Sequence, residues 1–323
     1  MRYLVTGGAG FIGGHLTESL LRDGEEVVII DNFSTGCRRN LAAVAGSPGL
    51  RVIEADVVVD AAVLEREVGE ADVIIHLAAA VGVELVVRDP VRTITTNVHG
   101  TENVLAPAAK YGKRTIIAST SEVYGKSSKP LFAETDDLLI GNPVHSRWSY
   151  ACSKLLDEFY LMAHCRMNDL PGTVVRFFNT VGPRQTGQYG MVVPRFVAAA
   201  LAGKPIPVYG DGTQSRCFCH VLDVVRALRA LAVNPHSYGK IYNIGSQRSI
   251  SIEELARLVI ERTASSSEIA RISYDQAYDK GFEDMMRRAP DTAAIRQLIG
   301  WQPEIPLEKI IDDVAAFARA DSK

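Results

Sequence analysis

A glycine-rich turn near the start of the chain constrains its fold more than any other feature. The residues from Gly7 to Gly13, which read G-G-A-G-F-I-G, separate a short apolar run, Tyr3–Val5, from an amphipathic helical pattern, Phe11–Leu21. In such a turn the first glycine permits the tight bend, Gly10 lets the backbone approach a pyrophosphate, and the last glycine lets the helix pack on the strand. A strand, a glycine turn and a helix in this order predict a dinucleotide-binding α/β fold, with the phosphates at the positive end of the helix.

The first half of the chain alternates between short apolar runs and helical stretches, which predicts a parallel sheet with helices on both faces. The expected strands are Tyr3–Val5, Val27–Ile30, Val52–Glu54, Val73–Leu77, Thr115–Ala118 and Val174–Phe178. The other expected helices are Trp148–Met167, Ile252–Thr263 and Leu307–Ala320. We predict a Rossmann-type, doubly wound parallel sheet over residues 1–178 and a smaller mixed α/β substrate-binding domain over residues 179–323. A further strand, Lys240–Ile244, is expected to return to the first sheet.

Composition narrows the class of protein. A chain of 323 residues exceeds what one ordinary core holds, so one large and one smaller domain are expected. The formal net charge of -3 leaves no basic footprint for nucleic acid, and no apolar run approaches membrane-spanning length. The five cysteines lack zinc-type spacing, which favours reduced thiols and predicts no metal site. The N-terminus lacks the layout of a signal peptide, so we expect a cytoplasmic protein without nucleic-acid or membrane partners.

An acid follows the turn at the distance expected for a ribose-binding residue. Asp31 ends the second expected strand, about twenty residues after the glycines, where a carboxylate binds the adenosine ribose hydroxyls. A carboxylate there repels a 2′-phosphate, which favours NAD over NADP. Asp56, after the third strand, is either a partner of the adenine amino group or an ordinary loop acid, and Asn32 and Val57 lie beside the two acids. The alternative for the whole pattern is a surface turn with an unrelated acid.

A tyrosine and a lysine form the candidate catalytic pair. Tyr150 and Lys154 stand four residues apart within Trp148–Met167, so a helix places them on one face. A phenol with its ordinary pKa of about 10 is a poor base at neutral pH, but an ammonium and a nicotinamide cation nearby both favour the phenolate. Tyr150 would then take a proton from a substrate hydroxyl while hydride leaves the same carbon for NAD. A surface contact between the two side chains is the alternative.

Further segments carry a family resemblance over essentially the whole chain. They are Leu77-Ala78-Ala79, Asn97, Ser119-Thr120-Ser121-Glu122-Val123-Tyr124-Gly125 and Arg176-Phe177-Phe178-Asn179-Thr180-Val181-Gly182-Pro183-Arg184. With the glycine turn and the Tyr150–Lys154 pair, the chain resembles the extended short-chain dehydrogenases/reductases, which include nucleotide-sugar epimerases, dehydratases and decarboxylases. The resemblance implies that Thr120 hydrogen-bonds the reacting oxygen beside Tyr150. The NAD-binding residues expected from the motifs and the resemblance are Gly7, Gly10, Phe11, Ile12, Gly13, Asp31, Asn32, Asp56, Val57, Leu77, Ala78, Ala79, Asn97, Tyr150 and Lys154.

The segment Thr120-Ser121-Glu122 distinguishes branches of this family. Removal of water needs an acid as well as a base, and 4,6-dehydratases usually carry an Asp-Glu pair where this chain has Ser121-Glu122. The Thr-Ser-Glu form resembles the UDP-glucuronic acid decarboxylases, including UDP-xylose synthases, and Arg147–Cys152 resembles the related apiose-forming enzymes. For Glu122, a buried and hydrogen-bonded acid is the alternative to a catalytic one.

A second segment agrees with the decarboxylase branch. Tyr278–Asp284 and Arg287–Asp291 resemble the C-terminal stretch of bacterial UDP-glucuronate decarboxylases, in which an arginine two places before the proline, here Arg288, reaches the active site. Nucleotide binding is the alternative role for Arg288. The loop Gln185–Met191 instead resembles loops of bacterial relatives with varied 4-epimerase activities, so a UDP-glucuronate or UDP-glucose 4-epimerase remains the main alternative. A 4,6-dehydratase and a non-catalytic NAD-binding regulator are the remaining ones.

The resemblance therefore implies an NAD-dependent UDP-glucuronic acid decarboxylase. Oxidation of C4 makes the C5 carboxylate a β-keto acid, which loses carbon dioxide because the ketone accepts the electrons as an enolate. Return of hydride to C4 would give UDP-xylose, and release before that step would give a UDP-4-keto-pentose. The expected catalytic residues are Thr120, Glu122, Tyr150, Lys154 and Arg288.

A UDP-sugar needs cations for its diphosphate and a pocket for its base. Guanidinium groups bind phosphate oxygens in pairs, so Arg184, Arg195 and Arg216 are candidates. The resemblance implies that Asn179 and Arg216 contact the diphosphate, and Val208-Tyr209 is expected to border the uracil. The expected substrate-binding residues are Ser121, Glu122, Asn179, Arg184, Arg195, Val208, Tyr209, Arg216 and Arg288. A packed histidine is favoured over an extra base for His220.

Assembly is a further expectation from the resemblance. Relatives form homodimers by pairing two helices from each subunit, and the stretches near Val98–Lys110 and Trp148–Met167 are the candidates here. Internal packing of their apolar residues is the alternative.

Overall fold

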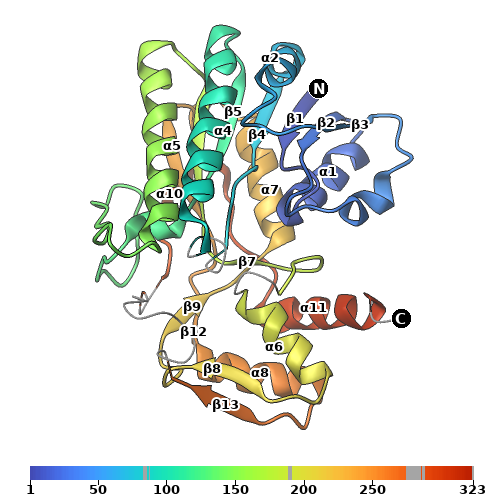
Figure 1. Ribbon diagram of the computed structural model, residues 1–323, viewed down its shortest axis with the longest axis vertical. Helices are drawn as coiled ribbons and strands as arrows, with labels where there is room; N and C mark the ends of the chain where they lie inside the picture. The colour runs from blue at the N-terminus through green and yellow to red at the C-terminus, as the bar shows by residue number, and fades with distance from the viewer. Residues whose placement is uncertain (83–85, 87, 188–190, 274–284, 286–287, 322–323) are drawn as a thin grey trace.

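The computed structural model describes residues 1–82, 86, 88–187, 191–273, 285 and 288–321 (Figure 1). Its centre is a seven-stranded sheet with the order β11-β6-β5-β4-β1-β2-β3, in which every neighbouring pair is parallel. The strands are β1 (Arg2–Thr6), β2 (Glu26–Asp31), β3 (Leu50–Glu54), β4 (Val73–His76), β5 (Arg114–Thr120), β6 (Gly172–Phe177) and β11 (Lys240–Ile244). This is the doubly wound Rossmann-type architecture predicted from the alternating apolar runs, and the prediction is confirmed.

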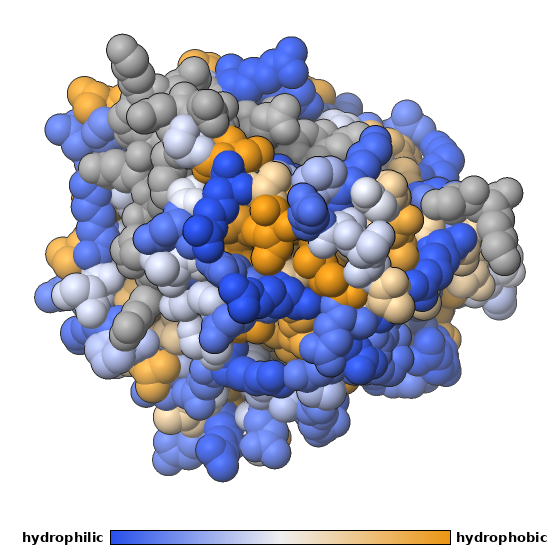
Figure 2. All heavy atoms as spheres, turned by 90° about the horizontal axis from the view of Figure 1, so that it is seen from below, coloured by the Kyte–Doolittle hydropathy of each residue, from blue (hydrophilic) through white to orange (hydrophobic). Residues whose placement is uncertain are grey.

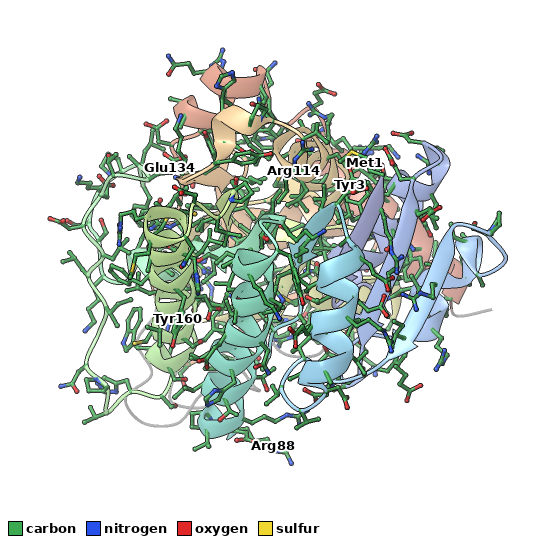
Figure 3. The ribbon with its side chains drawn as sticks, turned by 90° about the horizontal axis from the view of Figure 1, so that it is seen from above. Met1, Tyr3, Arg88, Arg114, Glu134 and Tyr160 are labelled. Carbon is green, nitrogen blue, oxygen red and sulfur yellow. The ribbon has the colours of Figure 1, made fainter. Side chains whose placement is uncertain are left out.

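Both faces of the sheet are covered because the strand side chains alternate and are apolar on each side. Helices α1 (Phe11–Arg22), α7 (Val221–Ala232) and α10 (Ala293–Ile299) pack on the face that carries Val5 and Ile29. Helices α2 (Ala61–Glu70), α4 (Pro90–Lys110) and α5 (Trp148–Met167) pack on the face that carries Leu4 and Val28. Figure 3 shows α2, α4 and α5 side by side along their face of the sheet.

The remaining elements form a second, smaller core below the sheet in Figure 1. Helices α6 (Val192–Leu201), α8 (Ile252–Thr263) and α11 (Leu307–Asp321) bury apolar side chains against β8 (Ile206–Tyr209). Short paired strands complete this part: β7 (Thr180–Val181) with β10 (Cys219–His220), β9 (Ser215–Cys217) with β12 (Ser249–Ser251), and β8 with β13 (Ile269–Ile272). Seen from below in Figure 2, hydrophobic side chains gather near the middle of this face and hydrophilic ones surround them.

The chain crosses between the two cores several times. Strand β11 pairs in parallel with β6, so Lys240–Ile244 does return to the first sheet. Helices α7 and α10 also contribute to the first core, although both follow residue 178 in the sequence. The division into domains at residue 178 stays a prediction.

Three short 3-10 helices complete the described structure: η1 (Arg38–Val44), η2 (Ser121–Tyr124) and η4 (Pro235–Ser237). None of the helices in the described ranges combines the length and the apolar character needed to cross a membrane. The same part of the chain contains no group of three or more His, Cys, Asp or Glu side chains arranged to hold a metal ion.

Candidate active site

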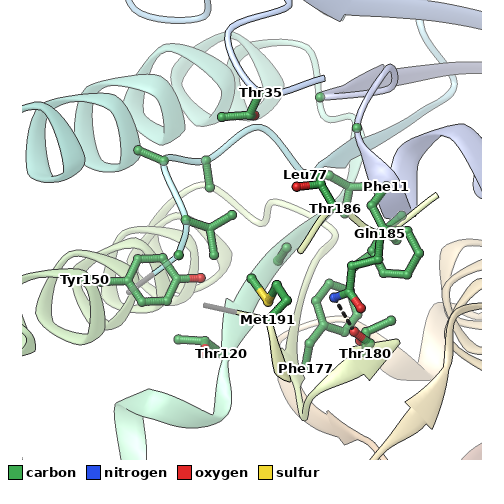
Figure 4. A pocket seen from close by; sticks show the side chains of 18 of the residues that line it. Phe11, Thr35, Leu77, Thr120, Tyr150, Phe177, Thr180, Gln185, Thr186 and Met191 are labelled. Atoms are coloured by element: carbon green, nitrogen blue, oxygen red, sulfur yellow. Dashed lines mark hydrogen bonds between the residues drawn. The ribbon is translucent and has the colours of Figure 1, made fainter. Parts of the chain in front are cut away.

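A cavity of about 520 Å³ lies at the carboxyl ends of the central strands, between the sheet and the smaller core (Figure 4). Sheet order reverses between β1 and β4, and crevices outside such a reversal are where doubly wound sheets bind ligands. The glycine turn, the ends of β2 to β5, the first turns of α5 and the segment after β7 all line the cavity. Residues of both cores therefore line the same cavity.

The glycine turn has no room for side chains at its critical positions. Gly7 has a φ of +69°, and a Cβ on it would lie 2.7 Å from the Ala78 nitrogen. A Cβ on Gly13 would collide with the carbonyl oxygen of Gly7. Helix α1 begins at Phe11 without a side-chain cap, so its first N–H groups face the cavity end of the turn. This cradle fits a pyrophosphate.

The adenosine end is formed by the acids at the ends of β2 and β3. The Asp31 carboxylate is buried and accepts hydrogen bonds from the backbone N–H of Ala9 at 2.9 Å and of Phe33 at 2.8 Å. Burial raises the pKa of Asp31, and the two N–H groups oppose that rise. Asn32 donates to Asp56 at 2.7 Å. Asp31, Asn32, Asp56 and Val57 all line the cavity, so the residues present fit the adenosine half of a dinucleotide.

Tyr150 and Thr120 both line the cavity, and their side chains are hydrogen-bonded to each other. Tyr150 lies on the first turn of α5, and Thr120 is the last residue of β5 (Figure 4). Burial raises the pKa of Tyr150 and the Glu122 charge raises it further, while a hydrogen bond with Thr120 lowers it. The phenol therefore holds its proton in this structure, and a positive charge is needed nearby before Tyr150 can serve as a base.

Lys154 shares a helix face with Tyr150, as its spacing predicts, but its charge is committed to another residue. The ammonium donates to Asp157 Oδ2 at 2.6 Å, and the two side chains are 2% and 0% exposed. Burial raises the pKa of the Asp157 carboxyl, and the Lys154 ammonium opposes that rise. The expectation that this ammonium and a nicotinamide cation together favour the Tyr150 phenolate stays a prediction, and the Asp157 carboxylate offsets part of the ammonium's charge. Asp157 carried no signal in the sequence, because an acid three residues after a lysine is usually a surface pair.

Behind this pair lies a buried histidine that links two strands to α4. His76 contacts Thr6 Oγ1 at 2.7 Å through Nδ1 and Thr101 Oγ1 at 3.1 Å through Nε2. Burial lowers the pKa of His76 to about 3, so the ring is neutral near pH 7. A neutral ring with both nitrogens bonded holds the ends of β1 and β4 in register beside the glycine turn.

Glu122 and Arg288 come together although 166 residues separate them. Arg288 Nη1 lies 3.2 Å from Glu122 Oε1, and both side chains are about one-seventh exposed, 13% and 15%. Ser121 is buried beside them, and all three line the cavity. The segment Tyr278–Asp284 and Arg287, which carried part of the sequence argument, lie outside the described residues. Arg288 is therefore the residue of that segment whose place in the cavity the structure describes.

The expected nucleotide residues divide into two groups. Arg195, Tyr209, Arg216 and Asn179 line the cavity. Arg195 donates to the Tyr209 hydroxyl at 2.5 Å and lies over its ring, so the two form one wall. Asn179 donates to the Cys217 carbonyl at 2.8 Å, which leaves its amide oxygen for other donors.

For three expected site residues the structure shows other surroundings than the sequence predicted. The Val208 side chain is fully buried in the smaller core, because strand alternation turns its neighbours Pro207 and Tyr209 toward the cavity instead. Asn97 does not line the cavity; it is buried and holds the loop after β4 by accepting from Ala80 N–H at 2.8 Å.

Arg184, the third of them, lines the cavity but is not placed to clamp a diphosphate. Its guanidinium group is bonded to the Glu18 carboxylate on both oxygens, at 2.7 and 2.8 Å. The sequence gives no sign of a partner so distant along the chain.

The structure also adds cavity residues that no motif marked. They include Ser34, Thr35, Asn40 and Thr96. His220 is not among the lining residues; it caps α7 by accepting from Leu222 N–H at 3.1 Å, as expected of a packed histidine.

The model of the NAD dependent epimerase/dehydratase family matches residues 3–245. The chain belongs to this family. The family resemblance drawn from the motifs is thereby confirmed.

Relatives within the family extend over nearly the whole chain. A UDP-N-acetyl-alpha-D-glucosaminuronate decarboxylase of Bacillus cytotoxicus is 40% identical over 98% of each chain. UDP-glucuronic acid decarboxylase 1 of Xenopus tropicalis is 37% identical over 99% of this chain and 72% of its own length. Among solved structures, a UDP-glucose 4-epimerase of Thermotoga maritima is 31% identical, covers 100% of both chains and superposes with a TM-score of 0.88. A dTDP-glucose 4,6-dehydratase of Streptomyces venezuelae, solved with NAD, is 30% identical over 99% of this chain and 98% of its own, with a TM-score of 0.89.

Proposed function

We propose that this protein is an NAD-dependent decarboxylase of UDP-glucuronic acid. The observation that carries the proposal is the ion pair between Glu122 and Arg288 in the cavity that also holds Tyr150 and Thr120. A cation and a carboxylate in the same cavity as Tyr150 and Thr120 suit a substrate that bears a carboxylate next to the carbon being oxidised. The relatives named as decarboxylases support the same activity.

Oxidation of the sugar begins at Tyr150. Its phenolate takes the proton of the C4 hydroxyl, and Thr120 donates a hydrogen bond to the same oxygen. When bound, NAD accepts the C4 hydride and later returns it. The Tyr150 site then holds the C4 ketone oxygen, where negative charge grows as the C5–carboxylate bond breaks and the electrons move to an enolate.

Glu122 and Arg288 act at the other side of the ring in this proposal. The Arg288 guanidinium binds the sugar carboxylate before oxidation and leaves Glu122 available to position a water near C5. After carbon dioxide departs, a proton is delivered to C5 from that side, and hydride returns to C4. Atoms balance as one UDP-uronic acid and one proton giving one UDP-pentose and carbon dioxide.

The cofactor and the substrate base are parts of the proposal too. The buried Asp31 carboxylate supports NAD rather than NADP, since it repels a 2′-phosphate. Arg216 and Asn179 are placed in the cavity to hold the UDP diphosphate, with the Arg195–Tyr209 wall beside them. We place the enzyme in the cytoplasm.

A second substrate has a specific observation in its favour. The Bacillus relative named for UDP-N-acetylglucosaminuronate is 40% identical, and its named substrate bears the same C5 carboxylate. Epimerisation at C4 without loss of carbon dioxide remains the alternative reaction, supported by the solved epimerase relative.

We also propose a homodimer formed through α4 and α5. These helices lie side by side, and their outer surfaces expose Val91 at 73% and Phe159 at 62%. Ile94 and Leu156 are exposed nearby on the same two helices, at 44% and 42%. Apolar side chains gathered on neighbouring helices are the kind of surface that a second subunit covers.

One incubation series tests the reaction and the substrate together. Purified protein with NAD is given UDP-glucuronate, UDP-N-acetylglucosaminuronate or UDP-glucose, and nucleotide-sugar mass and carbon dioxide are measured. The proposal requires loss of carbon dioxide from UDP-glucuronate. Carbon dioxide released only from the N-acetyl sugar favours the second substrate, and a mass-neutral change of sugar identifies the epimerase.

A further inference from the structure

The segment Gly182–Thr186 after β7 is held against α1 and η1 by the side chains of His15, Glu18 and Arg184 and by the backbone carbonyl of Asn40. Arg184 binds both oxygens of Glu18 on α1, at 2.7 and 2.8 Å, and each of these side chains is only 16% exposed. The same guanidinium donates to the Asn40 carbonyl of η1 at 2.7 Å. Its other Nη lies 2.8 Å from His15 Nδ1 on α1. We call His15, Glu18, Asn40 and Arg184 the Arg184 cluster.

The hydrogen-bonding partners of His15 determine its protonation state and tautomer. His15 Nδ1 faces a guanidinium, which can only donate, and Nε2 lies 3.0 Å from the Pro183 carbonyl, which can only accept. The ring must therefore be neutral with its proton on Nε2. Burial lowers the pKa of His15 to about 4, which agrees with that assignment. His15 thus binds two residues of the segment Gly182–Thr186, namely Pro183 and Arg184.

The cluster continues directly into the cofactor end of the cavity. Asn40 donates through its side chain to the Ala9 carbonyl at 2.9 Å, and Ala9 N–H donates to Asp31 at 2.9 Å. Three hydrogen bonds, which pass through the covalent structure of Asn40 and Ala9, therefore connect Arg184 with the acid at the expected ribose site. Because Asn40 lies between them, the segment and the glycine turn are held as one unit.

The fastened segment forms a wall of the cavity. Arg184, Gln185 and Thr186 line it together with residues of the glycine turn, and Figure 4 shows Gln185 and Thr186 beside Phe11. Gln185 is braced by donating to the Thr180 carbonyl at 2.9 Å. Arg184 has a φ of +70°, a left-handed conformation that a non-glycine residue keeps only when its surroundings hold it there.

We propose that the Arg184 cluster is a clasp that keeps the segment Gly182–Thr186 closed over bound NAD and so sets the rate at which the cofactor leaves. The inference rests on the proposed function, in which the same NAD accepts and returns hydride and must stay bound throughout. Arg184 is in this account a positioning residue for the cofactor wall. This positioning role replaces the earlier expectation that Arg184 binds the UDP diphosphate.

Release of NADH, followed by its fluorescence after mixing with excess NAD, tests the clasp. Arg184→Met keeps the length of the side chain and removes its five donors, and Glu18→Gln keeps size but removes the charge. We expect NADH to leave at least about tenfold faster from either variant, because a charge-assisted, two-bond contact is lost. Changes in the double variant should be close to those of one single variant, since both break the same contact.

Arg195→Met is the matched control. Arg195 lines the same cavity but bonds to Tyr209, so its loss should weaken UDP binding and leave the NADH release rate within twofold of wild type. Arg184→Met should instead speed the release of NADH and leave the affinity for UDP unchanged. Circular dichroism and thermal melting establish whether each variant is folded. If Arg184→Met does not fold, Glu18→Gln alone is used for the test.

The possible results separate the clasp from the function on which it rests. NADH release that stays within twofold of wild type in folded Arg184→Met or Glu18→Gln overturns the clasp alone. Equal acceleration in Arg195→Met also overturns it, because the effect would then be a general loosening. Wild-type protein that binds no NADH overturns the proposed cofactor and the clasp together. Tight NADH binding without carbon dioxide release refutes only the decarboxylase.

Discussion

Replacement of Asp157 by Asn tests whether the buried Lys154–Asp157 pair exists as described. The side chains are 2% and 0% exposed and their charged atoms lie 2.6 Å apart. Asn still accepts a hydrogen bond but leaves the ammonium without a compensating charge. Removing one partner of a buried pair costs about 3–5 kcal/mol, and the surviving hydrogen bond places this case near about 3 kcal/mol. For a chain of this size, that corresponds to a fall in Tm of about 4 °C.

Thermal unfolding followed by circular dichroism measures the effect. Glu308→Gln is the control, since it breaks an ion pair with Arg248 whose side chains are 35% and 56% exposed. Such a surface pair contributes at most about 1 kcal/mol, so its Tm should fall by about 2 °C or less. Adding Lys154→Met to Asp157→Asn removes the uncompensated charge and should recover part of the lost stability. A Tm for Asp157→Asn that matches the control, or a double variant less stable than the single one, would refute this reasoning.

Three other predictions follow from the site and the surface. Tyr150→Phe removes the phenol oxygen that takes the C4 proton, so turnover should fall about a hundredfold or more while titration shows that the variant still binds NAD; a smaller loss contradicts its role as base. Calorimetric titration of cofactor-free protein should show NAD binding at least about tenfold more tightly than NADP because of the Asp31 charge, and equal affinities would contradict it. Phe159→Asp places a charge where the side chain is 62% exposed on α5; light scattering should change from dimer to monomer with little change in Tm, and a wild-type monomer at micromolar concentration would refute the dimer.

The fold was accessible from the sequence because its signals are local. Buried parallel strands are short runs of Val, Ile and Leu, and the glycine turn occupies positions where the structure has no room for a Cβ. Helix α5 begins and ends where its apolar spacing placed it, at Trp148 and Met167. The pairing of Tyr150 with Lys154 on one face follows from the helical period alone.

Contacts between distant segments could not be predicted in this way. Nothing near Arg184 in the sequence points to Glu18, yet that carboxylate decides what the guanidinium does. Asp157 looks like an ordinary surface acid until burial beside Lys154 is known. Strand alternation allows only one of Val208 and Tyr209 to point its side chain into the cavity, so the burial of Val208 could have been predicted. Glu122 and Arg288 were brought together in advance only through the family resemblance.

The central claim is that oxidation at C4 drives loss of carbon dioxide from C5 and that hydride then returns from the same cofactor. The most direct measurement is to convert UDP-glucuronate in D2O and to analyse the product by mass and NMR. The account predicts a UDP-pentose with one deuterium at C5, hydrogen retained at C4 and one equivalent of carbon dioxide. A product of unchanged carbon number, inverted at C4 and free of deuterium, would contradict it and identify a 4-epimerase.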